Sequence, residues 1–326
     1  MTMTTSNDIW QMAQPADKAF IHVGGDEAAI FLQSLLTANI DLLEIGHCMP
    51  GALLTPQGRV LFDMILYRQT DGFIIESDAP RIDDLFARLR RYRLRRPITL
   101  EIIGDLQSSV IWHPAGNASA PALPPEMVLY DDPRNRIIGN ADLGFRTLTT
   151  GAMEINSDIM ALGDINDWHY RRIAGGVPEG PIDLTPERAL MLEAGLDQLG
   201  AVDFAKGCYI GQEVTARTHY RGLVKRRLVP IMINAAPPAP DSDITYAGAV
   251  IATTKTSSCN TSSFTASACI TSTGASIALC LIKLSDIHAI LADPAGLFVD
   301  GAPASLAIPD WMTPLPDPAR TDKSNR

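Results

Sequence analysis

Five chemically distinct side chains crowd one short segment of the sequence, KGCYIGQE, at residues 206–213. Lys206 precedes Cys208 by two positions, and a glycine stands on either side of the Cys-Tyr-Ile core. The thiolate is the form of cysteine that attacks substrates and binds metals, and a nearby ammonium group favours it. The segment therefore predicts a reactive or metal-binding thiol at Cys208. The alternative is a small buried hydrophobic residue, with Lys206 as a solvated charge.

The other cysteine and histidine residues do not have the spacing of a metal centre. No CxxC pair occurs, and the six histidines are scattered. An odd number of cysteines without a recurrent spacing also argues against a disulfide framework. No resident metal is predicted, and Cys208 is the single thiol of interest among the five cysteines, Cys48, Cys208, Cys259, Cys269 and Cys280.

Composition limits the classes of function. The chain has 326 residues, 46% hydrophobic and 20% charged, which is typical of a soluble protein of two or three domains. Its net charge of −10 argues against direct nucleic-acid binding, which draws its affinity from phosphate neutralisation. No apolar run is long enough to span a membrane, and residues 1–8 lack the features of a signal peptide. We predict a cytoplasmic monomer with no membrane association.

The first hundred residues show the elements of an α+β fold. Alternating apolar residues predict strands at 18–25, 72–77 and 98–103, and two more on either side of a Pro–Gly turn at 56–58. Helices are predicted from Asp26, as N-cap, to residue 40 and over 81–96. This order of elements suits a split βαβ or ferredoxin-like module.

The rest of the chain changes character after residue 228. Helices are predicted at 165–176 and 185–201, before the cysteine motif. Residues 244–308 carry few helix signals and predict a small β-barrel, within which the Ser/Thr-rich run 253–276 has no assigned role. The predicted division is a disordered segment at 1–17, an α+β region of two interleaved modules at 18–228, a β-barrel at 229–310 and a disordered tail at 311–326.

The segment KGCYIGQEVTARTHYRGLVKRRL closely resembles the signature of the YgfZ family, folate-binding proteins of iron–sulfur cluster maintenance that are related to the glycine-cleavage T-protein. The blocks FLQSLLTANI, GALLTPQGRVLFDMILYR, DPRNRIIGNADLGFR, RRIAGGVPEG and MLEAGLDQLGAVDF resemble the family in the family's order, and together they cover about residues 18–230. The resemblance implies a T-protein-like ring of α+β modules around a central channel for tetrahydrofolate or a one-carbon derivative, followed by a small C-terminal β-barrel.

The same resemblance implies an accessory protein and not a classical enzyme. Its role would be assembly or repair of clusters in 4Fe–4S proteins, including tRNA-modifying enzymes, alongside other assembly factors. Cys208, with Lys206, would be the reactive group and would contact an iron–sulfur cluster in transit. The alternative is a folate-dependent aminomethyl or one-carbon transferase. The T-protein has two acidic residues where this chain has Phe62-Asp63, and the missing acid argues against that chemistry.

Candidate folate contacts follow from the resemblance, each with a structural alternative. Asp63 would meet the pterin or pair with an arginine, and Glu193 would be a ligand contact or a helix-surface residue. Tyr209 would stack on a flat ring or lie in the core. Gln212 and Glu213 would read the pterin's amide-like edge, cap the turn or start a strand.

Two groups of basic residues complete the candidates. One covers residues 88–96, and the other begins at Arg217 and runs to residue 227. They are solvated faces, or they pair with carboxylates such as the polyglutamate tail of cellular folates, with RNA or with an acidic partner. Arg217 is the predicted folate contact of this set.

Overall fold

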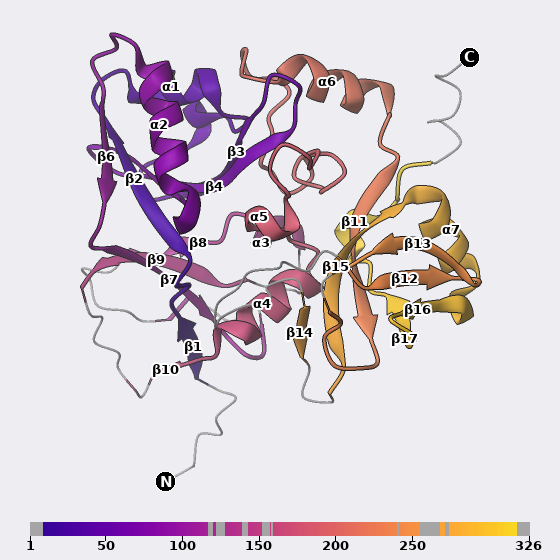
Figure 1. The fold of residues 1–326 in the computed structure, drawn as a ribbon. Coiled ribbons are helices and arrows are strands. Elements are labelled where there is room, and N and C mark those ends of the chain that lie inside the picture. The colour runs from indigo at the N-terminus through magenta and orange to yellow at the C-terminus, as the bar shows by residue number, and fades with distance from the viewer. Residues whose placement is uncertain are drawn as a thin grey trace. The chain divides into compact units, whose positions relative to one another are not determined.

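The computed structural model describes residues 9–116, 120–121, 128–138, 143–151, 157, 159–239, 241–254, 268–270 and 274–317. The chain forms two compact units (Figure 1). The first takes its residues from 1–54, 61–168 and 200–210, and the second from 55–60, 169–199 and 211–326. The domain borders given above stay a prediction. Most of the Ser/Thr-rich run lies outside the described residues.

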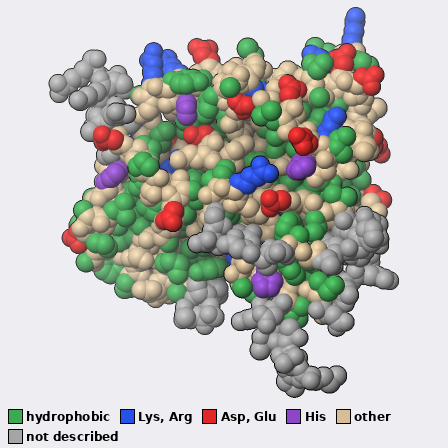
Figure 2. Space-filling view, turned by 180° about the vertical axis from the view of Figure 1, so that it is seen from behind, with side chains coloured by type: hydrophobic (Ala, Val, Ile, Leu, Met, Phe, Trp, Pro, Cys, Tyr) green, Lys and Arg blue, Asp and Glu red, His purple; other side chains and the backbone are tan. Residues whose placement is uncertain are grey.

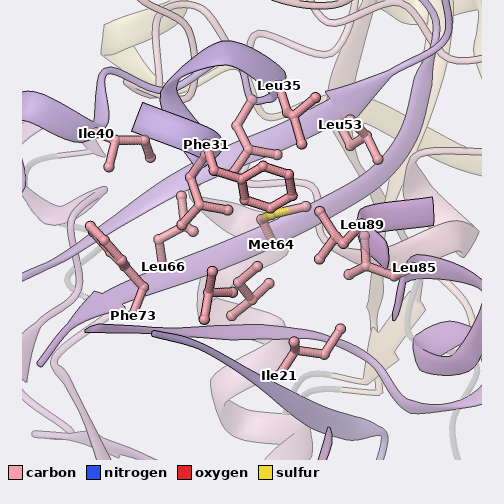
Figure 3. Packing of buried hydrophobic residues seen from close by; sticks show 14 of the residues in the cluster. Ile21, Phe31, Leu35, Ile40, Leu53, Met64, Leu66, Phe73, Leu85 and Leu89 are labelled. Atoms are coloured by element: carbon pink, nitrogen blue, oxygen red, sulfur yellow. The ribbon is translucent and has the colours of Figure 1, made fainter. Parts of the chain in front are cut away.

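A five-stranded sheet with two helices on one face forms the main core of the first unit. Its strand order is β3-β4-β5-β2-β6, and the strands span Cys48–Leu54, Val60–Arg68, Gly72–Asp78, Lys18–Gly24 and Thr99–Ile103. Helices α1 (Ala28–Leu35) and α2 (Ile82–Arg93) bury their apolar residues against it. Figure 3 shows Phe31 of α1 and Leu85 and Leu89 of α2 around Met64 of β4.

The strand predictions for this sheet are confirmed, because runs of Ile, Val, Leu and Phe suit a buried pleated surface. The predicted start of the first helix is wrong. Helix α1 begins at Ala28, and its N-cap residue is Glu27, whose side chain makes no capping hydrogen bond. The second helix ends at Arg93, three residues before the predicted end.

A second sheet of the first unit has the order β10-β1-β7-β9-β8. Its strands are Met160–Leu162, Trp10–Ala13, Leu106–Trp112, Phe145–Thr150 and Tyr130–Asp131. Strand β1 pairs with β7 and β10, and Trp10 is buried. The prediction of a disordered segment over 1–17 is therefore wrong for residues 10–13. Residues 1–8 lie outside the described part of the chain.

A buried charge network joins the two sheets of the first unit. Arg146 of β9 donates to Glu76 of β5 at 3.0 Å and to Asp132 at 2.9 Å, and Arg134 donates to Asp132 at 2.8 Å. All four side chains are almost fully buried. Burial alone would raise the pKa of Asp132, but Arg134 and Arg146 outweigh it and lower the pKa to about 2. The Asp132 carboxylate therefore stays charged at neutral pH.

The second unit is built on a seven-stranded sheet of order β13-β12-β16-β17-β11-β15-β14. The strands are Ala249–Thr253, Asp243–Tyr246, Leu297–Val299, Ala302–Leu306, Arg226–Ile233, Ser276–Lys283 and Ala268–Ile270. Strand β13 at one edge lies beside β15 near the other, so the sheet curls into a partial barrel. The β-rich character predicted for this region is confirmed.

Two helical features of this unit were not predicted. Helix α7 (Leu284–Ala292) packs on β15 through Leu284, Ile287 and Ile290, inside the region judged poor in helix signals. A 3-10 turn at Asp310–Met312 buries Met312, so residues 311–312 are not the disordered tail that was predicted. Residues 318–326 lie outside the described residues.

The helix predicted over 185–201 is wrong. These residues form a series of turns, in which Glu187, Gly195 and Gly200 have positive φ and interrupt any regular helix. The helix predicted at 165–176 is confirmed as α4 (Ile165–Ala174). The other helical segments are α3 (Asn135–Ile138), α5 (Gly180–Asp183), α6 (Gln212–Arg221), η1 (Ile40–Leu42), η2 (Ala79–Arg81) and η4 (Pro294–Gly296).

Acidic and basic side chains are interspersed on the surface drawn in Figure 2, among wide areas of hydrophobic and uncharged groups. Among the described helices, none combines the length and the apolar character that crossing a bilayer requires.

Candidate functional site

The cysteine loop, residues 203–210, is tied to one segment of the first unit, the link between α1 and η1. The amide of Asp203 donates to the carbonyl of Thr37 at 3.1 Å, and Asn39 donates to the Asp203 carboxylate at 2.7 Å. The buried hydroxyl of Thr37 donates to Ala201 at 2.6 Å and accepts from Ala52. Because Thr37 and Asn39 lie more than 160 residues from their partners, spacing alone did not reveal them, although both lie in the block FLQSLLTANI.

Lys206 is the deepest anchor of the loop. Its Nζ donates to the carbonyls of Leu36 at 2.7 Å and Ala38 at 2.6 Å, and the residue is only 7% exposed. The solvated lysine considered above is therefore wrong. Burial lowers the pKa of Lys206 to about 8, and the carboxylates of Asp203 and Asp41 oppose this shift only in part.

Tyr209 is also an inward residue of the loop. Its ring is buried, and Lys206 Nζ lies 5.5 Å from the ring centroid, within the range of a cation–π contact. This placement matches the alternative of a core tyrosine. Lys206 and Tyr209 thus anchor the loop on either side of a short bulge that projects outward.

Gly207 and Cys208 form that bulge, and both are exposed. A side chain added at Gly207 would meet no atom within 4 Å, so there is open space beside the residue that precedes Cys208. The buried alternative for Cys208 is wrong. Cys48 and Cys280 are buried instead, and burial raises the pKa of each thiol. Within the described residues, no three His, Cys, Asp or Glu side chains are grouped to hold a metal.

Helix α6 of the second unit begins directly after the loop. Gly211 is its N-cap residue at φ +80°, a conformation that glycine adopts readily, and the helix ends at Gly222. Gln212 is half-buried, whereas Glu213 and Arg217 are exposed. Gln212 and Glu213 therefore open a helix, and the alternative in which they start a strand is wrong. His219 on the same helix lies 3.8 Å from Asp197.

Glu193 is a buried partner of Arg226 in the second unit. The guanidinium donates Nε to Oε1 and Nη2 to Oε2, both at 3.1 Å, and the backbone of Leu228 donates to the carbonyl of Glu193. The helix-surface alternative for Glu193 is wrong. Its carboxylate keeps lone pairs beyond the two that Arg226 uses, so it can still accept from a ligand N–H.

The neighbouring Arg227 is buried and donates to the carbonyl of Leu192 at 2.8 Å and to Gln198. Burial lowers the pKa of Arg227. This arginine fixes the turn that carries Glu193.

Asp63 lies half-buried on β4 of the first unit, where its carbonyl accepts from Ser77 Oγ at 2.8 Å. Burial raises the pKa of Asp78 to about 6, and the carboxylates of Asp17 and Asp63 add to this shift. The preceding Phe62 is buried, with the Arg81 guanidinium 4.3 Å above its ring centroid. Phe62 is thus a packed core residue where an aminomethyltransferase would carry its second acid.

In kind, the candidate groups fit a pterin, whose ring donates and accepts hydrogen bonds in its plane. Two carboxylates and one amide are present, at Asp63, Glu193 and Gln212. Asp63 belongs to the first unit, and Glu193 and Gln212 belong to the second.

No family model matches the chain. The chain is 35% identical over 266 residues to the mouse protein named iron-sulfur cluster assembly factor IBA57, mitochondrial, covering 76% of this chain and 72% of that protein. It is 35% identical to the human protein of that name over the same shares. An IBA57 homologue of Pyricularia oryzae is 36% identical over 227 residues, 66% of this chain and 56% of the homologue.

Among solved structures, the glycine cleavage system aminomethyltransferase T of Bartonella henselae matches with a TM-score of 0.65. The match covers 86% of this chain and 80% of that one, at 16% identity. This confirms the T-protein-like α+β fold. The matched assembly factors are mitochondrial by name, which overturns the predicted cytoplasmic location.

Proposed function

The chain belongs to the family of IBA57 iron–sulfur cluster assembly factors, and from this premise we propose that it is a tetrahydrofolate-binding accessory protein that presents Cys208 during cluster assembly or repair. The observation that carries the proposal is the contrast within one loop. Cys208 is exposed on a bulge whose neighbours, Lys206 and Tyr209, are buried and tied down. A thiol held this way can meet a partner's cluster without first paying to order its loop.

The clients in this proposal are 4Fe–4S proteins, including tRNA-modifying enzymes, and other assembly factors act with it. The cluster is cargo, because no complete set of metal ligands is grouped among the described residues. Cys208 would supply one ligand and the partner the others. Thiolate sulfur is the ligand that iron–sulfur clusters prefer.

Folate would be held through hydrogen bonds in the plane of its pterin. Within the second unit, Glu193 and Gln212 would accept from or donate to the ring, with Glu193 oriented by Arg226. Arg217 and Glu213 are exposed on α6 and would lie beside the part of the folate that extends from the pterin. Bound tetrahydrofolate would supply a reduced ring able to carry a one-carbon unit.

The second candidate is an aminomethyl or one-carbon transferase, favoured by the TM-score of 0.65 to aminomethyltransferase T. The packed Phe62 under Arg81 argues against it, since no second acid is available at that point of β4. Formation of methylenetetrahydrofolate from an aminomethyl donor would establish this candidate, and turnover no faster than without protein would exclude it.

The test of the proposal is genetic complementation with matched cysteine variants. The gene is deleted in its host and restored as wild type, Cys208→Ala or Cys280→Val, the last being a buried thiol replaced by a side chain of similar volume. We expect the activity of a 4Fe–4S enzyme under oxidative stress to return with wild type and Cys280→Val, and to stay low with Cys208→Ala. Full recovery with Cys208→Ala, at equal protein levels, would refute the thiol's role.

The folate part needs its own measurement. Calorimetric titration of the purified chain with tetrahydrofolate under nitrogen should give saturable binding that weakens at least tenfold in Glu193→Gln. Lys225→Met, an exposed basic residue near the same strand, serves as the control. An unchanged titration in Glu193→Gln would remove this residue from the folate site.

A further inference from the structure

Arginine crowds the end of helix α2, in the first unit. Six of the nine residues from 88 to 96 are arginine. The core side of the helix consists of Ile82, Leu85 and Leu89, all buried. The opposite surface is made of exposed residues, which we name the α2 arginine surface: Arg90, Arg91, Tyr92, Leu94 and Arg95.

Within the described part of the chain, the arginines of this surface form no ion pair with a carboxylate. Within the described residues, the run 88–96 makes one ion pair, between Arg96 and Glu27 at 3.0 Å. Cations in the last turn favour the helix dipole, but the effect of each is small and is shared by any one or two of them. Additional guanidinium groups at the same helix end repel one another, so the helix by itself does not explain their number.

Leu94 adds a second observation that does not depend on charge. Its side chain is 82% exposed, and its backbone has φ +52° and ψ −114°. The amide of Arg96 donates to the carbonyl of Arg93 at 3.0 Å, which closes a turn with Leu94 in its second position. These angles are those of a type II′ turn, where glycine is the residue without strain. The fold therefore holds an apolar side chain in water on a strained backbone.

We propose that the α2 arginine surface docks an acidic face of a partner protein, with Leu94 inserted into an apolar depression among the partner's carboxylates. Arginine and tyrosine are enriched among the residues that carry most interface energy, and interfaces commonly have an apolar centre within a polar rim. The inference does not depend on folate binding or on the Cys208 thiol, which lies in a different loop.

A protein fits these observations better than a nucleic acid. Phosphates would pair with the arginines but would leave Leu94 without a partner, because an aliphatic side chain does not pair with phosphate. A long polyanion would also meet the rest of a chain of net charge −10.

The partner is found by photo-crosslinking in the host. The full chain carries benzoylphenylalanine at position 92, in place of tyrosine, and a control chain carries it at position 250, in place of the exposed Val250. We expect one protein to be crosslinked from position 92 and not from position 250, and mass spectrometry names it. No crosslink specific to position 92, or crosslinks to nucleic acid alone, would overturn the proposal.

The identified protein is then purified and its binding is measured against matched variants. Arg90→Glu/Arg91→Glu should abolish binding, whereas Arg221→Glu/Lys225→Glu carries the same charge change and should leave it within threefold. Binding to wild type should weaken as salt is raised.

The variant Leu94→Gly tests whether Leu94 serves to bind the partner or to stabilise the fold. It should raise the midpoint of urea unfolding, because it relieves the turn, and weaken partner binding at least tenfold. Leu162→Ser, which removes another exposed leucine, should leave binding unchanged. Unchanged binding in Leu94→Gly, or a lowered unfolding midpoint, would show that Leu94 does not serve as the anchor.

Discussion

Replacing Lys206 by methionine tests whether a buried ammonium group holds the cysteine loop. Methionine has a similar length and fills the same space, but it donates no hydrogen bond. The carbonyls of Leu36 and Ala38 would lose their donors in a region where Lys206 is 7% exposed. The loop would then depend on Asp203 and on the packing of Tyr209.

Two opposing effects set the magnitude. A buried carbonyl left without a donor costs roughly 1–3 kcal/mol, so two carbonyls cost roughly 2–6 kcal/mol. Methionine also removes the cost of burying the ammonium. Burial lowers the pKa of Lys206 from 10.5 to about 8, a difference worth about 3 kcal/mol at neutral pH. The difference between these two terms spans about −1 to +3 kcal/mol at pH 7 and is centred near +1 kcal/mol, enough to open the loop about five times more often.

The lowered pKa of Lys206 also predicts how the stability difference between wild type and Lys206→Met changes with pH. Because the folded pKa lies below the unfolded value, the unfolded chain binds more protons between about pH 8 and 10.5. The unfolding free energy contributed by Lys206 therefore rises with pH through this window. Urea unfolding should show a gap between wild type and Lys206→Met that widens from pH 7.5 to pH 9.5.

Amide hydrogen exchange and thiol alkylation report on the loop itself. We expect amide exchange in residues 204–210 and alkylation of Cys208 to be faster in Lys206→Met than in wild type, because the loop opens more often. In Lys225→Met, which replaces an exposed lysine, both rates should match wild type. Unaltered exchange would refute the idea that Lys206 anchors the loop, and a gap that narrows with pH would contradict the lowered pKa of Lys206.

Three further predictions rest on other parts of the structure. Arg146→Met leaves the buried Glu76 without its charge partner and Asp132 with Arg134 alone, and should lower the unfolding free energy by about 3–5 kcal/mol in urea titrations; a loss below about 1 kcal/mol would contradict the network. Peptide mapping after brief iodoacetamide treatment should find Cys208 modified well before buried Cys48, and equal rates would contradict their burial. Gly144→Ala forces a methyl group against the Ile111 carbonyl at positive φ and should destabilise the fold by more than Gly151→Ala, where φ is also positive but no atom lies within 4 Å; thermal unfolding of the pair should order them this way.

Local sequence pattern predicted the elements whose residues decide their own structure. The strands of the first unit follow from runs of branched apolar residues, and α4 follows from its periodicity and terminal glycines. The pattern failed where special backbone angles override composition. Residues 185–201 are rich in helix formers, yet Glu187 and Gly195 at positive φ break them into turns. Helix α7 has a signal, the apolar spacing of Leu284, Ile287 and Ile290, but it is short and stands among strands.

The candidate site shows the same limit at the level of single side chains. Sequence and resemblance identified Cys208, but they could not tell which neighbours point inward. Lys206 is buried because its acceptors are carbonyls about 170 residues earlier in the chain, and Glu193 is buried because Arg226 lies on the next strand. Neither partner is visible from spacing, since both are produced by the tertiary fold.

These placements change what the density of chemical groups in KGCYIGQE means. The side chains that looked like one set of reactive residues point in different directions. Lys206 and Tyr209 point inward and fix the loop, whereas Cys208 points outward with open space around the adjacent glycine. Gln212 and Glu213 belong to the next helix. A reactive thiol must be exposed, and a thiol that meets a partner's cluster must also be held in a fixed position. In this motif the fixed position comes from Lys206 and Tyr209, which are buried and do not contact the partner. For this reason a conservative change at Lys206 should impair delivery by Cys208 while leaving the thiol in place.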